Sequence, residues 1–306
     1  MNPLVSVIIP NYNHARYLEQ RLESVFNQTY QNFEVIILDD CSTDNSLEII
    51  NKYKDNPHLT QIVVNEKNSG SAFFQWDKGI KLAKGEVIWI AESDDYCELN
   101  LLEELINAIQ VKQNVVVAFS SYVKFGDSGW SSRGKYRSIQ YYNGMEFVCG
   151  WMNMEAAIMN ASGAIFRRSA YENVTNEYLT FKTAGDYMFW IQIASQGDVA
   201  YVRHNLSYFR INSDTVTAQN MITGISAEED NRIIKYLHEN YDLSWLQKQL
   251  SYASFSMKYR YFSFPSKKTK EEVYKIWHIN ERNEKLDKLL LMFVGFIRRH
   301  WGFVNY

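Results

Sequence analysis

The feature that most constrains the fold is a regular alternation in the first third of the chain. Short apolar runs alternate there with segments in which apolar residues recur at helical spacing, such as Ala15, Leu18, Leu22 and Val25. The runs comprise residues 5–9, 33–38, 61–64 and 86–90. Strands that alternate with helices predict an α/β fold whose parallel sheet has right-handed crossovers. Because the runs are apolar almost throughout, helices are expected on both faces of the sheet.

Polar residues follow three of these runs. Pro10 is expected to end the first strand, because proline cannot donate to a ladder, and Tyr12 stands just beyond it. The pair 39–40 (Asp-Asp) ends the second run, and the pair 94–95 (Asp-Asp) follows the fourth. The carboxyl ends of parallel strands lie along one edge, so Tyr12 and both aspartate pairs should converge there.

Asp94 and Asp95 are candidates for a metal site. Two adjacent carboxylates repel each other and are costly to desolvate, and a divalent cation such as Mg or Mn relieves that repulsion. The chain contains neither GxGxxG after the first strand nor GxxxxGK[ST], so a metal would have to take the phosphate-holding role of a glycine-rich loop. The alternative is a solvated turn in which an aspartate caps the next helix.

Composition excludes several classes of protein. A net charge of -3 provides no general attraction for nucleic acid. Three cysteines without a CxxC pair fit a reduced, cytoplasmic protein that has no zinc site. The first three residues lead straight into a strand-like run, so we expect no signal peptide, and no run of 18 apolar residues suggests a spanning helix.

Five motifs in this order and spacing resemble the family 2 glycosyltransferases, which are inverting, nucleotide-sugar-dependent enzymes. The motifs are residues 6–13 (SVIIPNYN), 22–29 (LESVFNQT), 39–44 (DDCSTD), 79–86 (GIKLAKGE) and 93–95 (SDD). The resemblance extends over roughly the first 215 residues. It implies a GT-A fold, in which helices flank a Rossmann-like, mostly parallel central sheet.

The resemblance also implies a nucleotide site. Asp40 would accept a hydrogen bond from the base, with Asp39 beside it, and Tyr12 would pack against the base. Pro10 belongs to the same first-strand motif and is expected at the nucleotide. Asp94 would lie near the ribose.

The same resemblance implies the metal ligand and the catalytic base. Asp95 would bind Mn or Mg, supported by Asp94. A strand over 161–166 and an amphipathic helix that opens within 183–190 are expected in the second half. This helix resembles the family's "GDxxxW" segment, whose aspartate, here Asp186, is the inverting base. The alternative is that Asp186 only caps its helix.

The chain departs from the family pattern at several positions. Asn212 stands where histidine is common, which removes support for a metal or phosphate contact there. Residues 74–77 (Phe-Gln-Trp-Asp) stand where many members have Ala-Arg-Asn, so the basic residue is missing, and Trp76 is expected in the core, with stacking on the donor sugar as the alternative. Arg210 could contact the diphosphate or form a surface ion pair. We assign no role to His14.

The expected domain organisation has two parts. Residues 1–217 form the GT-A catalytic domain, in which 1–112 bind the nucleotide and 113–217 bind the acceptor. Residues 218–306 form a helical C-terminal region. In that region 286–301 is apolar with basic residues at its ends and is too short to span a bilayer. It could lie on an anionic lipid surface, dock onto the catalytic domain or contact a dimer partner.

Together these features predict a metal-dependent inverting glycosyltransferase of cell-surface polysaccharide synthesis. It would move a sugar from a nucleotide-diphosphate donor, expected to be a UDP-sugar, to a hydroxyl of a glycan acceptor, which in such families is often lipid-linked. The expected location is the cytoplasm, including the inner face of the plasma membrane. An inactive nucleotide-sugar-binding module is one rival, although it should have lost Asp95 or Asp186. A sugar-nucleotide pyrophosphorylase is another, although it needs a glycine-rich basic loop after the first strand, which is missing here.

Overall fold

A computed structural model describes residues 2–126, 131–132, 138–211 and 216–300. Ten strands within these ranges form one sheet, whose main path runs β3-β2-β1-β4-β9-β6-β10-β5. The strands are β1 (Val5–Asn11), β2 (Phe33–Asp39), β3 (Leu59–Val64), β4 (Val87–Ile90), β5 (Tyr96–Cys97), β6 (Val115–Gly126), β7 (Ser131–Ser132), β8 (Ile139–Tyr142), β9 (Ala164–Arg167) and β10 (Asp198–Ile211). The sheet is mostly parallel, as predicted, with β5, β7, β8 and β9 antiparallel to their neighbours.

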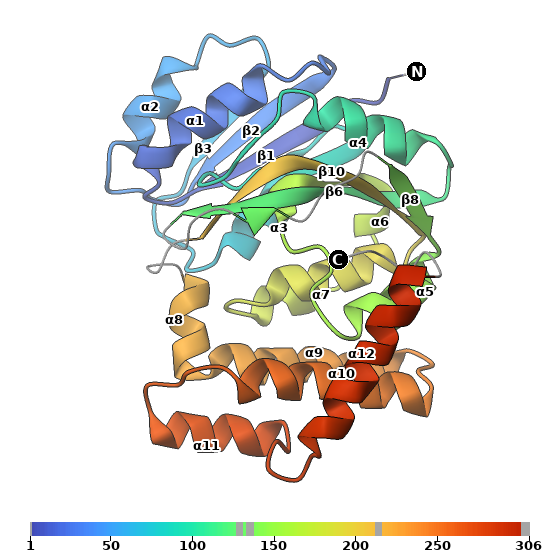
Figure 1. The fold of residues 1–306 in the computed structure, drawn as a ribbon. Helices are drawn as coiled ribbons and strands as arrows, with labels where there is room; N and C mark the ends of the chain where they lie inside the picture. The colour runs from blue at the N-terminus through green and yellow to red at the C-terminus, as the bar shows by residue number, and fades with distance from the viewer. Residues whose placement is uncertain (1, 127–130, 133–137, 212–215, 301–306) are drawn as a thin grey trace.

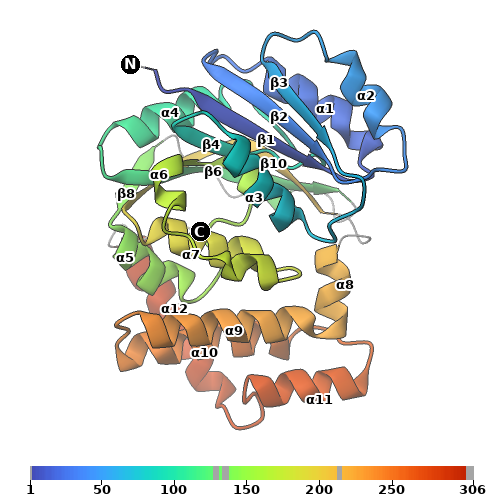
Figure 2. The same cartoon turned by 180° about the vertical axis from the view of Figure 1, so that it is seen from behind.

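Helices cover both faces of the sheet, which confirms the expectation from the apolar runs. Helices α1 (Ala15–Phe26), α2 (Ser46–Lys52) and α4 (Leu101–Gln110) lie over one face (Figure 1). Helices α3 (Ala72–Leu82) and α7 (Gly185–Ala194) lie under the other (Figure 2). The short helices α5 (Gly144–Phe147) and α6 (Arg168–Tyr171) lie on the α7 side. β1, β2 and β4 are buried along their whole length between these layers.

The first strand does not end at Pro10, contrary to the prediction. β1 continues to Asn11, and Pro10 is still in register with Leu38 of β2. The ladder with β4 ends at Ile8, whose carbonyl accepts from Ala91 N. Because alternate residues face opposite neighbours, the nitrogen of Pro10 points to the side where the β4 ladder has already stopped. The missing N–H is therefore not needed there.

The second half of the sheet was predicted less accurately. The strand expected over 161–166 begins only at Ala164, because residues 161–163 form a 3-10 turn that Asn160 caps by accepting from Ser162 N. β9 then lies antiparallel between β4 and β6. This arrangement brings the 161–163 turn beside the loop that follows β4.

The helical C-terminal region is confirmed and forms a further layer below α7 (Figures 1 and 2). It comprises α8 (Val216–Thr223), α9 (Ile225–Asn240), α10 (Trp245–Arg260), α11 (Lys267–Ile276) and α12 (Glu284–His300). Its apolar side chains join those of α3 and α7 in one continuous core. No helix in the described part of the chain has the length and apolar character needed to cross a membrane.

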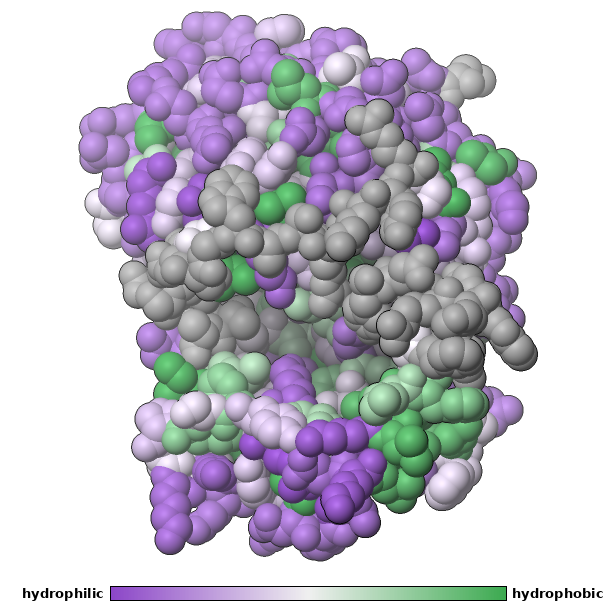
Figure 3. Space-filling view, in the orientation of Figure 1, coloured by the Kyte–Doolittle hydropathy of each residue, from purple (hydrophilic) through white to green (hydrophobic). Residues whose placement is uncertain are grey.

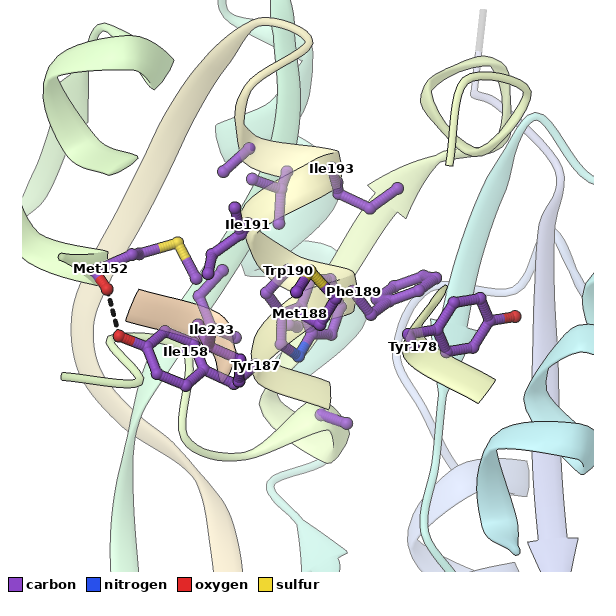
Figure 4. Packing of buried hydrophobic residues seen from close by; sticks show 14 of the residues in the cluster. Met152, Ile158, Tyr178, Tyr187, Met188, Phe189, Trp190, Ile191, Ile193 and Ile233 are labelled. Atoms are coloured by element: carbon purple, nitrogen blue, oxygen red, sulfur yellow. Dashed lines mark hydrogen bonds between the residues drawn. The ribbon is translucent and has the colours of Figure 1, made fainter. Parts of the chain in front are cut away.

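Helix α7 is not amphipathic, contrary to the prediction. Every side chain from Tyr187 to Ala194 is buried. Figure 4 shows the reason: Phe189 packs toward Tyr178, while Tyr187 on another side of the helix lies near Ile233 of α9 and donates a hydrogen bond to Met152 O. The C-terminal helices cover the face that would otherwise meet solvent, so that face carries no polar stripe.

Candidate active site

A pocket of about 450 Å³ opens where the predicted strand ends meet. Tyr12 follows β1, Asp40 follows β2, and Asp94 and Asp95 follow β4; all of them line it. Asp186, from the first turn of α7, lines the same pocket. The predicted convergence of the strand ends is therefore confirmed, and it includes the candidate base from a distant part of the sequence.

The pocket is strongly acidic. Its described lining contains five carboxylates, those of Asp40, Glu92, Asp94, Asp95 and Asp186. The same lining contains the basic side chains of Lys182 and His14. An anionic ligand would meet net negative charge here, so a bound cation would favour its entry.

Asp94 and Asp95 lie in a turn that is braced from β10. Asp95 is almost fully buried, and its Oδ1 accepts a hydrogen bond from Arg210 N at 2.9 Å. Burial, and then the charge of Asp94, hold the pKa of Asp95 well above its usual range. The guanidinium of Arg210 donates from Nε to Asp94 O at 2.7 Å and lies between the rings of Tyr17 and Phe125. Arg210 thus supports the acidic turn, which neither sequence interpretation had foreseen.

Glu92 is a site residue to which sequence reasoning gave no role. Its Oε1 accepts a hydrogen bond from Trp76 Nε1 at 2.7 Å, and burial, followed by the charge of Asp94, raises the pKa of Glu92 to about 8. Trp76 is only 2% exposed and packs edge-on against Phe189, so its predicted place in the core is confirmed. It also lines the pocket and fixes the Glu92 carboxyl group.

A buried arginine lies beneath the acidic turn. Arg21 on α1 is fully buried and donates from Nε to Glu92 O at 2.8 Å. Its positive charge favours ionisation of both Asp95 and Glu92, opposing the effect of burial. The sequence contained a signal for this residue, because Arg21 occupies a position in the apolar stripe that contains Leu18 and Leu22. A charge at such a position is rarely buried without a partner.

The two aspartates after β2 occupy different environments. Asp40 lines the pocket, and its Oδ1 accepts from Asn65 Nδ2, Ser69 N and Gln75 Nε2 at 2.6–2.9 Å. Gln75 on α3 therefore helps to hold the carboxylate in place. Asp39 is fully buried outside the described pocket lining and accepts from Asn11 Nδ2 at 2.8 Å. Its contact with a base stays a prediction.

Other predicted residues also line this pocket. Pro10 and Tyr12 both line it, and Tyr12 is 45% exposed, so its side chain is accessible for stacking. His14, to which the sequence analysis gave no role, also lines the pocket, with Nδ1 2.8 Å from Ser93 Oγ. Asn212 lies outside the described residues.

Asp186 reaches the pocket because a glycine precedes it. A Cβ at Gly185 would lie 2.5 Å from the Phe73 ring, so only glycine allows α7 to start this close to α3. The Oδ1 atom of Asp186 accepts from Tyr187 N at 2.7 Å. Burial raises the pKa of the Asp186 carboxyl to about 7, which is close to the ideal for a general base at neutral pH.

The carboxylates suit a hard cation that is shared with a substrate. The described residues contain no cluster of three or more His, Cys, Asp or Glu side chains arranged to hold a metal alone. Magnesium, however, is commonly held by one or two carboxylates together with substrate phosphates. Asp94 and Asp95, whose mutual repulsion a cation would relieve, provide such a partial set.

Comparison with known proteins identifies the family. Residues 6–175, more than half of the chain, match the sequence profile described as glycosyl transferase family 2. The chain belongs to this glycosyltransferase family. Over 128 residues it is 39% identical to glycosyltransferase GlyG of Streptococcus pneumoniae, a match that covers 42% of each protein. The chain covers between 42% and 50% of the length of GlyG and two further relatives.

A longer match is to a protein of Escherichia coli. WfaP, named UDP-Glc:alpha-D-GlcNAc-diphosphoundecaprenol beta-1,3-glucosyltransferase, is 28% identical over 243 residues, which cover 76% of this chain and 90% of WfaP. Among solved structures, S. aureus TarS 1-349 in complex with UDP-GlcNAc superposes with a TM-score of 0.67 at 22% identity. That match covers 85% of this chain and 73% of TarS 1-349. The structural likeness confirms the GT-A fold.

Proposed function

We propose that this family 2 glycosyltransferase moves a sugar from a UDP-sugar to a hydroxyl of a glycan, with inversion at the anomeric carbon. The observation that carries the proposal is the shared pocket: Asp94 and Asp95 after β4 and Asp186 at the start of α7 line one cavity. Relatives support the donor and the acceptor class, since WfaP is named for a UDP-Glc donor and TarS 1-349 was solved with UDP-GlcNAc.

The chemistry requires one base and one stabilised leaving group. The acceptor hydroxyl attacks C1 of the donor sugar, and the bond between C1 and the diphosphate oxygen breaks. Asp186 takes the hydroxyl proton, which its pKa of about 7 allows once the carboxyl is ionised. Single attack from the face opposite the leaving diphosphate inverts the anomeric centre.

Asp95, supported by Asp94, would hold a divalent Mn or Mg ion that neutralises charge on the departing diphosphate. This chain contributes two oxygen-bearing side chains in a turn held rigid by Arg210 and Arg21. Tyr12 would stack on the base, and Asp40 would present its fixed carboxylate to it.

The acceptor is proposed to be a glycan of cell-surface polysaccharide, lipid-linked as the name of WfaP indicates for that protein.

Helix α12 presents an apolar row in which Leu286, Leu289, Met292 and Phe293 are 54–70% exposed. Figure 3 shows hydrophobic colour over this side of the molecule. A lipid surface or a second copy of the chain could cover this row. Flotation with anionic vesicles and sedimentation of the free protein distinguish these two occupants.

Calorimetric titration of UDP, with and without Mn, tests the nucleotide and metal sites together. Wild-type protein is expected to bind UDP more tightly with Mn, and Asp95→Ala should lose that dependence. Transfer from UDP-Glc or UDP-GlcNAc to a synthetic lipid-linked glycan should then stop in Asp186→Asn. Failure of UDP, GDP and dTDP to bind with either metal would overturn the proposal and favour the inactive binding module.

A further inference from the structure

The loop before α7 is held by a carboxylate from the C-terminal helices. Glu229 on α9 accepts a hydrogen bond from Lys182 N at 2.7 Å through Oε1. Its Oε2 accepts from Thr183 N and Ala184 N, both at 2.9 Å. Glu229 is 5% exposed, so these three backbone N–H groups satisfy a carboxylate that would otherwise be costly to bury.

The same loop has two further anchors on these helices. Asn220 Nδ2 on α8 donates to Thr183 Oγ1 at 2.6 Å. Arg232 on α9 donates from Nη2 to Thr180 Oγ1 at 2.9 Å, and its guanidinium lies 4.0 Å from the centre of the Phe181 ring. The described contacts thus tie residues 180–184 to α8 and α9.

The loop needs this external support because α7 lacks a cap of its own. Its N-cap residue is Ala184, which has no side-chain oxygen to accept from the first helical N–H groups. Glu229 accepts instead from the three backbone N–H groups that lead into the helix, where the helix dipole also favours an anion. Asp186 stands two residues after Ala184, so the anchor and the candidate base belong to one rigid turn.

We propose that Glu229 is a positioning residue for sugar transfer, holding the 182–184 loop so that Asp186 faces the acceptor hydroxyl in the pocket. The inference rests on the base role proposed for Asp186. Lys182 and Thr183 also line the pocket, so the C-terminal helices support part of the pocket wall through this loop.

The charge of Glu229 also affects the pKa of Asp186, and this effect can be measured in the pH dependence of kcat. Burial is the main cause of the raised pKa of Asp186, and the charges of Asp230 and Glu229 raise it further. Asp230 is paired with Lys258 Nζ at 2.6 Å and Tyr259 OH at 2.5 Å on α10, and it is left unchanged in the test. Removing the Glu229 charge should therefore move the acidic limb of the pH–kcat profile to lower pH.

The test compares Glu229→Gln with Glu228→Gln, which makes the same chemical change at the exposed neighbouring position. For Glu229→Gln we expect kcat at pH 8 to fall about tenfold or more, since small misplacements of a catalytic group are costly. The donor KM should stay within about twofold, because the nucleotide side of the pocket is untouched. Backbone amides 182–184 should exchange faster with deuterium. Glu228→Gln should match wild type in every measurement.

Two further variants separate positioning from folding. Val273→Ala, a core change in α11, should lower stability while leaving kcat and the pH profile unchanged. Asn220→Ala removes only the bond to Thr183 and should lower kcat about twofold to fivefold, even if Glu229→Gln fails to fold. An unchanged kcat in both loop variants, with active wild type, would overturn the positioning role alone. No transfer by wild type from any nucleotide-sugar would overturn the proposed function as well.

Discussion

Replacing Asp186 by asparagine should greatly slow transfer and yet stabilise the protein at alkaline pH. The pKa of Asp186 lies near 7 in the folded protein, against an ordinary value of 3.8, chiefly because the carboxyl is buried. A difference of this size corresponds to about 4 kcal/mol, at about 1.4 kcal/mol per pKa unit. Since the carboxyl faces the pocket, solvent reduces that cost, and we expect a gain of about 1–4 kcal/mol at pH 8.

The sign of the effect follows from proton linkage. A carboxyl whose pKa is raised by folding binds its proton more tightly in the folded chain. Its favourable contribution is fully present below pH 3.8 and is lost as the pH rises through about 7. Asparagine cannot ionise, so the variant keeps that stability at pH 8. Near pH 4 the wild type and the variant should agree within about 1 kcal/mol.

Urea denaturation at pH 4, 6 and 8 measures this difference directly, with the exposed Asp55→Asn as the matched control. The control should show no change in the gap between pH 4 and pH 8. Transfer by Asp186→Asn at pH 8 should fall about 10²- to 10⁴-fold, the range expected on losing a general base. A pH-independent stability difference, or an asparagine variant less stable than wild type at pH 8, would refute the account of Asp186 as a desolvated base.

Three other substitutions test the support of the site. Arg21→Met removes the buried positive charge beside Glu92 and Asp95, so it should lower the free energy of unfolding by about 3–5 kcal/mol. It should also weaken Mn-dependent UDP binding, and an unchanged UDP affinity in calorimetry would contradict this expectation. Trp76→Phe should cost about 1–3 kcal/mol in urea denaturation through the lost hydrogen bond to Glu92, and a neutral result would show that this bond is unimportant. Gly185→Ala should lower kcat, since the new Cβ would lie 2.5 Å from the Phe73 ring. Adding Phe73→Leu to this variant should restore part of the lost kcat. An unchanged kcat in Gly185→Ala would argue against tight positioning of α7.

The parallel half of the fold was predictable because its signals are local. Each apolar run from β1 to β4 is short and followed by helical spacing, and parallel strands place their carboxyl ends on one edge regardless of detail. The sequence alone therefore predicts that Tyr12, Asp40, Asp94 and Asp95 belong to one site. Resemblance to a known family was needed to add Asp186, because no pattern within the chain links residue 186 to the strand ends.

The errors have a common cause in tertiary contacts. The periodicity around α7 predicts an amphipathic helix, but α9 covers its second face, so every side chain from Tyr187 to Ala194 is buried. Pro10 predicts a strand end, but its nitrogen faces the side where the β4 ladder has stopped, so the strand continues to Asn11.

The sequence by itself determined the alternation of strands and helices in the first third of the chain, the acidic turn after β4 and the family to which the chain belongs. Those features depend on residue type and spacing along a short stretch. Only the tertiary structure decided that Glu229, some 43 residues after Asp186, caps the loop of the candidate base, and that Arg21 lies beneath Asp95. Such contacts depend on how distant elements pack, and neither burial nor a hydrogen-bond partner far along the chain is encoded in a local pattern.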